Sequence, residues 1–245
     1  MIKYAIFDID GTLRETGKNV SQESLDAIRK LEENGVKIFF ASGKHPWYTT
    51  GGTVFGDILK DDTIVIGENG GYIFKPRRKE DTILAKSEDV EKIKAMFYIE
   101  IDKMKINFWE EPKRTIFTIY PLNEKENNIK KLVNFFEEKI KENNLDLYVT
   151  HCKDAVDVVP NKMNKSVALK YLEENGELKL EETIAFGDGK NDYEMLSSVK
   201  IPITFNNALN EIKELVKSKN GYVSDLSYGK GVLDAVTYLI ENKKI

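Results

Sequence analysis

The sequence predicts an α/β fold in which a parallel sheet is interrupted by a separate α+β unit. Short apolar strands alternate with helical segments over roughly the first 70 residues, and the same alternation returns at about residue 165. The stretch between them instead carries strand pairs and two helices. Strand–helix–strand units with short loops form right-handed crossovers, so the two outer stretches are expected to build one parallel sheet.

The first outer stretch supplies three of the expected strands. Tyr4–Phe7 is an apolar run that ends in a turn signal, and residues 36–41 and 63–66 are two further buried strands. Residues 21–34 carry apolar side chains at helical spacing, with a serine placed to cap the start and Asn-Gly as a stop signal. A loop and a short helical stretch, ending at about residue 59, connect the second strand to the third.

The middle stretch, residues 82–160, is expected to form the inserted α+β unit. Residues 89–97 and 127–142 are predicted helices, and the second has its apolar side chains on one face. Four strands in two pairs are expected in the same stretch, at residues 105–109, 115–120, 145–150 and 155–159.

The α/β pattern then resumes. The elements expected there are helices at 165–175, 193–198, 210–217 and 231–241 and strands at 182–186 and 201–205. Pro202 lies within the last of these strands and predicts an edge position, because proline cannot donate to a central ladder. The organisation expected is therefore a Rossmann-like parallel-sheet core made of residues 1–81 and 161–245, with residues 82–160 as a second domain.

The composition excludes several classes of function. The chain has 245 residues, 41% of them hydrophobic, so it can bury a sizeable core, and its net charge of −4 argues against nucleic-acid and membrane partners. It has no apolar run of about 18 residues, and Met1 leads directly into the first strand, so neither a membrane span nor a signal peptide is expected. The single cysteine, Cys152, excludes an internal disulfide and a cysteine-rich zinc site. We expect a cytoplasmic monomer or homodimer.

Two acids directly follow the first strand. Asp8 and Asp10 are spaced i, i+2, so their side chains point the same way and repel unless a cation lies between them. Mg²⁺ is the simplest candidate, since it prefers oxygen ligands and is held by a few carboxylates together with a substrate phosphate. Gly11 allows a sharp turn, and Thr12 offers a hydroxyl and an N–H to an anion. Taken alone, the acid pair is equally typical of an acidic surface loop.

Other predicted strands end in polar residues as well. Ser42 follows the second strand, and Asp188 and Asp192 follow the strand at 182–186. The carboxyl ends of parallel strands meet at one edge of a sheet, where ligands bind. We therefore expect these residues to lie beside Asp8, although Asp188 is 180 positions away in the sequence (188 − 8). Asp8 and Asp188, with Asp192, would hold Mg²⁺ together with the backbone carbonyl of the second acid and waters.

Four segments of the chain resemble the motifs of the haloacid dehalogenase superfamily of phosphatases. Asp8-Ile9-Asp10-Gly11-Thr12 resembles the first motif, Ser42 matches the second, Lys165 the third, and Gly187-Asp188-Gly189-Lys190-Asn191-Asp192 the fourth. Lys162 is a rival for the third motif, but Lys165 is the lysine that opens a helix of small and apolar residues. The resemblance covers the whole chain and implies that the inserted unit is the larger type of cap domain.

The resemblance also implies roles for individual residues. Asp8 would attack phosphorus and become an aspartyl-phosphate, while Asp10 would protonate the leaving alcohol and then take a proton from water. The residues expected to contact the phosphoryl group are Thr12, Ser42, Gly43, Lys165 and Asn207. Those expected to hold Mg²⁺ are Asp8, Asp10, Asp188, Asn191 and Asp192.

Three further segments resemble one branch of the superfamily, the archaeal phosphoglycolate phosphatases. They are residues 67–71, 107–111 and 223–229, and the last two lie outside the catalytic motifs. The resemblance implies a small phosphorylated metabolite, phosphoglycolate, as substrate. A sugar-phosphate or mannosyl-phosphoglycerate phosphatase, a phosphomutase and a non-catalytic phosphate-binding module are the alternatives. A dinucleotide site is excluded, because no G-x-G-x-x-G follows the first strand.

Overall fold

The computed structural model describes residues 1–85 and 88–245, and the chain divides into two compact units. The core unit comprises residues 1–82 and 164–245, and the inserted unit comprises residues 83–163. The boundaries expected from the sequence differ from these by one residue at the first junction and by three at the second.

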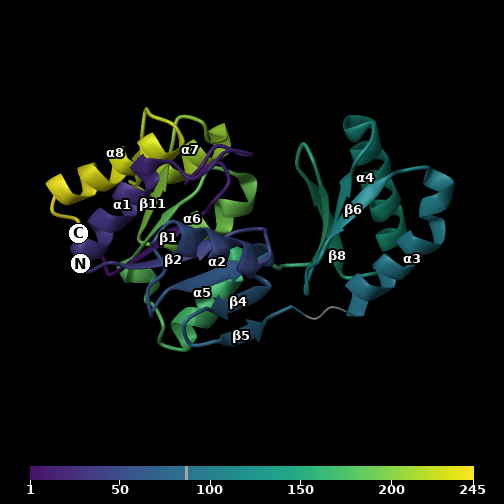
Figure 1. Ribbon diagram of the computed structural model, residues 1–245, viewed down its shortest axis with the longest axis horizontal. Helices are drawn as coiled ribbons and strands as arrows, with labels where there is room; N and C mark the ends of the chain where they lie inside the picture. The colour runs from purple at the N-terminus through teal and green to yellow at the C-terminus, as the bar shows by residue number, and fades with distance from the viewer. Residues whose placement is uncertain (86–87) are drawn as a thin grey trace. The chain divides into compact units, whose positions relative to one another are not determined.

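An eight-stranded sheet in the order β12-β11-β10-β1-β2-β3-β4-β5 contains the core unit's strands (Figure 1). All pairs from β12 to β3 are parallel, and β3 pairs with β4 in the antiparallel sense. The predicted fold class, an α/β protein with a parallel-sheet core and an α+β insertion, is therefore confirmed. The strands are β1 (Tyr4–Phe7), β2 (Lys37–Ala41), β3 (Ile64–Gly67), β4 (Tyr72–Lys75), β5 (Glu80–Ile83), β10 (Thr183–Phe186), β11 (Ile201–Thr204) and β12 (Tyr222–Val223).

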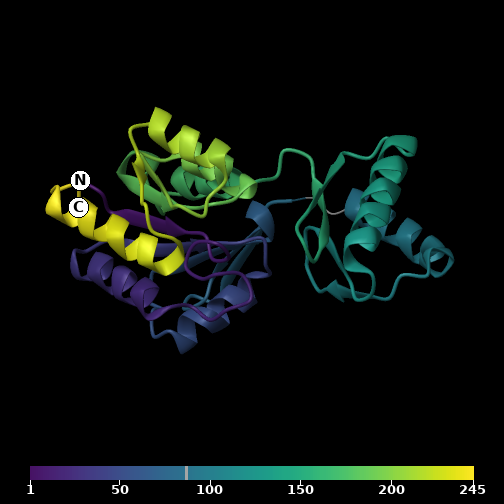
Figure 2. The same cartoon turned by 90° about the horizontal axis from the view of Figure 1, so that it is seen from above.

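Helices cover both faces of this sheet. In Figure 2 the purple α1 and the yellow α8 lie side by side on one face, while the green helices α5 to α7 lie on the other. The helices are α1 (Gln22–Glu33), α2 (Pro46–Phe55), α5 (Lys165–Glu174), α6 (Tyr193–Ser198), α7 (Asn210–Ser218) and α8 (Tyr228–Glu241), with short 3₁₀ turns at η1 (Glu68–Gly70), η2 (Leu180–Glu182) and η3 (Lys190–Asp192). The expected cap of α1 is present, because Ser21 Oγ accepts a hydrogen bond of 3.3 Å from the Ser24 N–H.

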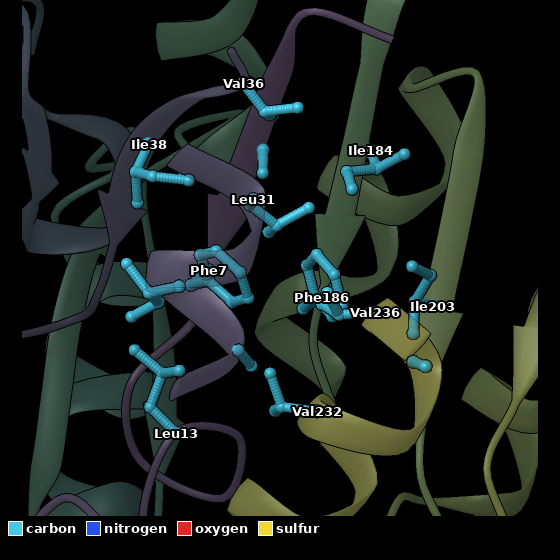
Figure 3. Packing of buried hydrophobic residues seen from close by; sticks show 14 of the residues in the cluster. Phe7, Leu13, Leu31, Val36, Ile38, Ile184, Phe186, Ile203, Val232 and Val236 are labelled. Atoms are coloured by element: carbon cyan, nitrogen blue, oxygen red, sulfur yellow. The ribbon is translucent and has the colours of Figure 1, made fainter. Parts of the chain in front are cut away.

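The apolar core lies between the central strands and the α1–α8 pair. Phe7 of β1 and Phe186 of β10 stack with their ring centroids 4.3 Å apart. Leu31 of α1 and Val232 and Val236 of α8 pack around them (Figure 3). This packing fixes β1 beside β10, and therefore fixes the two loops that leave their carboxyl ends.

The inserted unit has its own sheet and its own core. Its antiparallel strands run in the order β6-β7-β9-β8, and helices α3 and α4 cover one face of the sheet. Phe97, Phe117 and Phe136 lie at the centre of the apolar cluster on that face. Across residues 1–85 and 88–245, no helix is long and apolar enough to cross a membrane. The elements are α3 (Glu88–Met104), β6 (Phe108–Glu111), β7 (Phe117–Pro121), α4 (Lys125–Glu142), β8 (Leu147–His151) and β9 (Val156–Pro160).

The sequence-based prediction differs from the structure at the two ends of the core sheet. It omitted β4, β5 and β12, which are short and lack long apolar runs. The edge position predicted from Pro202 is wrong, because β12 lies outside β11. The pairing with β12 begins only at Ile203, one residue after the proline, so the missing N–H of Pro202 does not interrupt that ladder.

Candidate active site

The candidate site lies at the carboxyl ends of the central parallel strands. Asp8 directly follows β1, and its N–H donates to the Phe186 carbonyl of β10 at 3.0 Å, which aligns the two strand ends. Asp188 and Asp192 lie in the loop that follows β10. Oxygens of the three carboxylates lie within 4.8 Å of one another. The structure thus brings together the three acids for which the sequence predicts a shared cation.

A buried lysine lies in the middle of these acids. Lys165 is the first residue of α5, and its Nζ lies 2.6 Å from Asp8 Oδ1 and 2.6 Å from Asp192 Oδ1. Burial acts to lower the pKa of Lys165, but the charges of Asp192 and Asp8 outweigh it, so the pKa is raised and the side chain stays cationic. Lys162, the rival considered for this position, is exposed.

Asp192 has both carboxylate oxygens in use. Oδ1 pairs with Lys165, and Oδ2 accepts hydrogen bonds of 3.0 Å from the N–H groups of Asp188 and Gly189. Asp192 therefore orients the loop that carries Asp188 and fixes the lysine at the same time. Both oxygens of this predicted metal-binding residue are thus already engaged within the described structure.

The other two acids are left with an excess of negative charge. Burial, followed by the charge of Asp192, raises the pKa of Asp8 well above its usual range in spite of Lys165, and the same two causes raise the pKa of Asp188 to about 7. Asp8 Oδ2 is buried, and among the described residues it has no hydrogen-bond partner. Three carboxylates thus face one ammonium group.

These residues fit a divalent hard cation. The donors of Asp8 and Asp188 are carboxylate oxygens, which Mg²⁺ prefers, and the unpartnered oxygen of Asp8 is a ready ligand. Gly11 makes room for the carboxylate of Asp188. The φ of Gly11 is +94°, and a Cβ there would lie 2.3 Å from Asp188 Oδ2. Thr12 donates to Asp188 Oδ1 at 3.3 Å, which orients that carboxylate.

The remaining predicted residues surround the same strand ends. Ser42 is buried and its Oγ accepts from the N–H of Lys44 at 3.1 Å. Gly43 follows Ser42 in the loop after β2. Asn207 uses its amide on backbone groups, donating to the Gly11 carbonyl at 2.8 Å and accepting from the Tyr228 N–H at 3.0 Å. Within the described structure, Asn207 therefore joins the first loop to the start of α8.

Comparison with known proteins identifies the family of the chain. The model of a haloacid dehalogenase-like hydrolase family matches the chain in two overlapping segments, residues 5–108 and 80–235. The chain belongs to this family. It is 26% identical over 238 residues to a phosphoglycolate phosphatase of Methanobrevibacter smithii, and the alignment covers 94% of each chain.

Solved structures show that this hydrolase shares its fold with other members of the family. A haloacid dehalogenase-like hydrolase from Bacteroides thetaiotaomicron superposes with a TM-score of 0.82 at 18% identity, covering 98% of this chain and all of the other. A sugar phosphatase of subclass IIB of the same superfamily superposes with a TM-score of 0.69 at 20% identity, covering 99% of this chain and all of that one.

Asn69 was not among the predicted site residues of this hydrolase, although it belongs to the segment 67–71 that resembles one branch of the superfamily. Asn69 lies in η1, after β3 at the same edge of the sheet, and its N–H donates to the Ser42 carbonyl at 3.2 Å. Asn191 Nδ2 lies 3.5 Å from Asn69 Oδ1, which links the predicted fourth motif to this turn. Glu68, Asn69 and Gly70 all have positive φ, an arrangement that for non-glycine residues costs about 1–3 kcal/mol each. The strained turn is consistent with a role in shaping the loop that carries Ser42 and Gly43.

Proposed function

We propose that this chain is a Mg²⁺-dependent phosphomonoester hydrolase that works through an aspartyl-phosphate and acts on phosphoglycolate. The observation that carries the proposal is Asp8 Oδ2, a buried carboxylate oxygen without a hydrogen-bond partner in the described structure, beside the ammonium group of Lys165. An anionic nucleophile held next to a fixed cation suits attack on an anionic phosphate ester.

The first step transfers the phosphoryl group to the enzyme. An oxygen of Asp8 forms a bond to phosphorus while the bond between phosphorus and the ester oxygen breaks. Asp10 supplies the proton that the leaving oxygen takes up, so that an alcohol departs. Lys165, Ser42, Thr12 and the backbone at Gly43 hold the phosphoryl oxygens.

The second step returns the enzyme to its starting state. A water molecule attacks phosphorus and gives its proton to the Asp10 carboxylate, and the bond between the Asp8 oxygen and phosphorus breaks. Inorganic phosphate then leaves, and Asp10 again carries the proton needed for the next ester.

The residues proposed to hold Mg²⁺ are the side chains of Asp8 and Asp188 and the carbonyl of Asp10, with Asp192 and Asn191 supporting them from the same loop. When bound, the cation neutralises charge between the nucleophile and the phosphate. The protein keeps these carboxylates close together and buried. Their mutual repulsion and their poor solvation both favour binding of a divalent cation.

The choice of phosphoglycolate is supported by relatives named phosphoglycolate phosphatase and by the resemblance of residues 67–71, 107–111 and 223–229 to that branch, the last two of which lie outside the catalytic motifs. The inserted unit is proposed to act as a cap that selects the leaving group. A sugar phosphate is the second candidate, supported by the fold shared with a sugar phosphatase. Mannosyl-phosphoglycerate, a phosphomutase reaction and non-catalytic phosphate binding follow as further alternatives. The partner expected in each case is a small phosphorylated metabolite, and a cytoplasmic location remains part of the proposal.

The test is phosphate release from a panel of small phosphate esters, with Mg²⁺ and with EDTA. Wild type should release phosphate only with the metal, and fastest from phosphoglycolate. Asp8→Asn should be slower by at least about 10³-fold, because the nucleophile is lost. Asp61→Asn is the matched control, since the Asp61 side chain is fully exposed. No release from any ester would contradict the hydrolase proposal, and faster release from sugar phosphates would contradict the substrate.

A further inference from the structure

Arg14 contacts Asp10, one of the two acids of the first motif, through two of its nitrogens. Its Nη2 lies 2.6 Å and its Nε 2.8 Å from the same oxygen, Asp10 Oδ1. The Arg14 side chain is 17% exposed and that of Asp10 is 26% exposed, so the pair is shielded but not sealed from water. Charge-assisted contacts of this kind fix orientation as well as contributing energy.

The guanidinium is itself held on its other sides. Nη2 also donates to the Tyr48 hydroxyl at 2.9 Å, and Nη1 donates to the Lys18 carbonyl at 3.2 Å. The guanidinium carbon lies 5.6 Å from the centre of the Tyr48 ring. Arg14 therefore joins the loop after β1 to helix α2, and most of its rotamer freedom is already lost before any substrate binds.

The backbone makes the same loop rigid. The Gly11 N–H donates to the Arg14 carbonyl at 2.8 Å, and the Arg14 N–H donates to the Ile9 carbonyl at 3.2 Å. Asp10 is thus enclosed in a short loop that closes on Arg14. Without the arginine, a half-shielded aspartate at the end of this loop would sample several rotamers.

We infer that Arg14 is a positioning residue for Asp10. By holding Oδ1, it leaves Oδ2 as the oxygen that exchanges a proton with the ester oxygen and later with water. The inference rests on the proposed function, in which Asp10 carries that proton, and it extends the site to a residue outside the four motifs. Arg14 touches neither Asp8 nor Lys165 among the contacts found in the described residues, so it acts on proton transfer rather than on nucleophilic attack.

Esters with different leaving groups separate these two steps. Departure of an alkoxide requires a proton, whereas p-nitrophenolate leaves readily without one. We would compare the alkyl ester that wild type cleaves fastest with p-nitrophenyl phosphate, both with saturating Mg²⁺. Arg14→Gln should lower kcat/KM for the alkyl ester by about 10- to 100-fold, which is less than the whole contribution of general acid–base catalysis, and should leave kcat/KM for p-nitrophenyl phosphate little changed. The ratio kcat/KM is compared because it covers the steps up to departure of the leaving group and excludes the hydrolysis of the aspartyl-phosphate, which both esters share. Arg29→Gln on α1 is the matched control, because Arg29 forms an exposed ion pair with Asp26.

Two further variants keep the test decisive. Tyr48→Phe removes one partner of the guanidinium and should give a smaller loss, also confined to the alkyl ester. In the Asp10→Asn background, adding Arg14→Gln should cost nothing more on the alkyl ester, because the positioned group is already gone.

Equal losses on both esters would overturn the inference and indicate a role in folding, and so would losses that multiply in the double variant. An Arg14→Gln enzyme as fast as wild type on the alkyl ester would overturn it as well. In each of these cases wild type still releases phosphate, so the proposed function survives. If wild type cleaves neither ester, the proposed function has failed and the role of Arg14 falls with it.

Discussion

Each of the two units contains a buried lysine between two carboxylates. The core unit has Lys165, whose side chain is 0% exposed, and the inserted unit has Lys113, whose side chain is 3% exposed. Burying an ion pair costs desolvation free energy that is recovered only when the remaining polar atoms find partners. The two clusters differ in whether this condition is met.

The Lys113 cluster is complete. Its Nζ lies 3.2 Å from Glu111 Oε2 and 3.6 Å from Asp157 Oδ1, and it donates to Thr118 Oγ1 at 2.8 Å. Thr118 donates in turn to Asp157, and the Tyr120 hydroxyl donates to Glu111 at 3.1 Å. Over the described ranges, no buried polar atom of this cluster lacks a partner. The hydroxyl groups of Thr118 and Tyr120 thus donate hydrogen bonds to the two carboxylates in addition to those of the Lys113 ammonium group.

The Lys165 cluster, in contrast, has a buried carboxylate oxygen without a hydrogen-bond donor among the described residues. It has a third carboxylate, Asp188, and the buried Oδ2 of Asp8 has no partner in the described structure. The pKa values of both acids are raised as a result, first by burial and then by the neighbouring charge of Asp192. A lysine between two acids is therefore not sufficient to indicate an active site, whereas carboxylates in excess of the available donors are a much better indication.

Replacing each lysine by methionine tests this comparison most severely. Lys165→Met removes the one positive charge among the side chains described around Asp8 and should lower kcat by about 10²–10³-fold, the usual cost of losing one fixed donor to a transition state. Lys113→Met should instead lower the free energy of unfolding by about 3–5 kcal/mol, because Glu111 and Asp157 lose the ammonium group that they share, and should keep most of the activity toward p-nitrophenyl phosphate.

Phosphate release and urea denaturation of both variants are the measurements. A Lys113→Met protein that is folded at the assay temperature but as inactive as Lys165→Met would show that both clusters serve the reaction, and the comparison would be wrong.

The sequence predicted those parts of the site that depend on local signals. Asp8 and Asp10 follow an apolar strand directly, and the parallel arrangement alone requires Asp188 to lie near them. The partners of Asp192 were not predictable, because they depend on the exact path of the loop after β10. Arg14 was missed for a related reason: its spacing from Asp10 is that of an ordinary helical ion pair, and only the structure shows that the two residues lie in a closed loop after β1.

The fold shows the same limit. Long apolar strands and amphipathic helices were found from periodicity, whereas the two-residue strand β12 has no pattern that distinguishes it from a loop. Pro202 was assigned to an edge strand because proline cannot donate to a ladder, and that rule was applied to the whole strand. In the structure the pairing of β11 with β12 begins at Ile203, one residue after the proline.

Two glycines with positive φ allow a sharper test of the crowding around Asp188. Gly11 and Gly17 have φ values of +94° and +81°, so alanine at either position bears a similar strain of about 1–2 kcal/mol. A Cβ at Gly11 would lie 2.3 Å from Asp188 Oδ2, whereas a Cβ at Gly17 has no atom of the described residues within 4 Å apart from those of its two chain neighbours. Gly11→Ala should therefore displace the carboxylate and reduce kcat at limiting Mg²⁺ by about 10–100-fold, in the range found for changes to the support of metal ligands.

Gly17→Ala is the control for backbone strain in this pair. In thermal unfolding with EDTA it should show the loss that comes from backbone strain alone, about 1–2 kcal/mol, and it should keep its response to Mg²⁺. If the activity of Gly11→Ala rose with Mg²⁺ as it does in wild type, the position of the Asp188 carboxylate beside Gly11 would not matter for Mg²⁺ binding, and the prediction would be wrong.

The smallest expected effect is on stability, and its dependence on pH separates the two clusters. The pKa of Asp188 is raised to about 7 in the folded chain from an ordinary value of 3.8, so the folded form prefers the protonated acid. Without metal, the stability that this group contributes is full below about pH 4 and is lost as the pH rises through about 7. The free energy of unfolding in EDTA should fall over that window.

Mg²⁺ binds the carboxylate form, so it should offset this loss more strongly at pH 8 than at pH 5. At about 100 times its Kd it should contribute about 2.7 kcal/mol, or roughly 5–10 °C in Tm for a chain of this size. Asp188→Asn should remove most of the response to Mg²⁺ and make the metal-free protein more stable than wild type at pH 8, whereas Asp157→Asn in the Lys113 cluster should leave the response intact. An equal shift at both pH values, or one retained in Asp188→Asn, would mean that the excess carboxylates of the core unit are not what binds the cation.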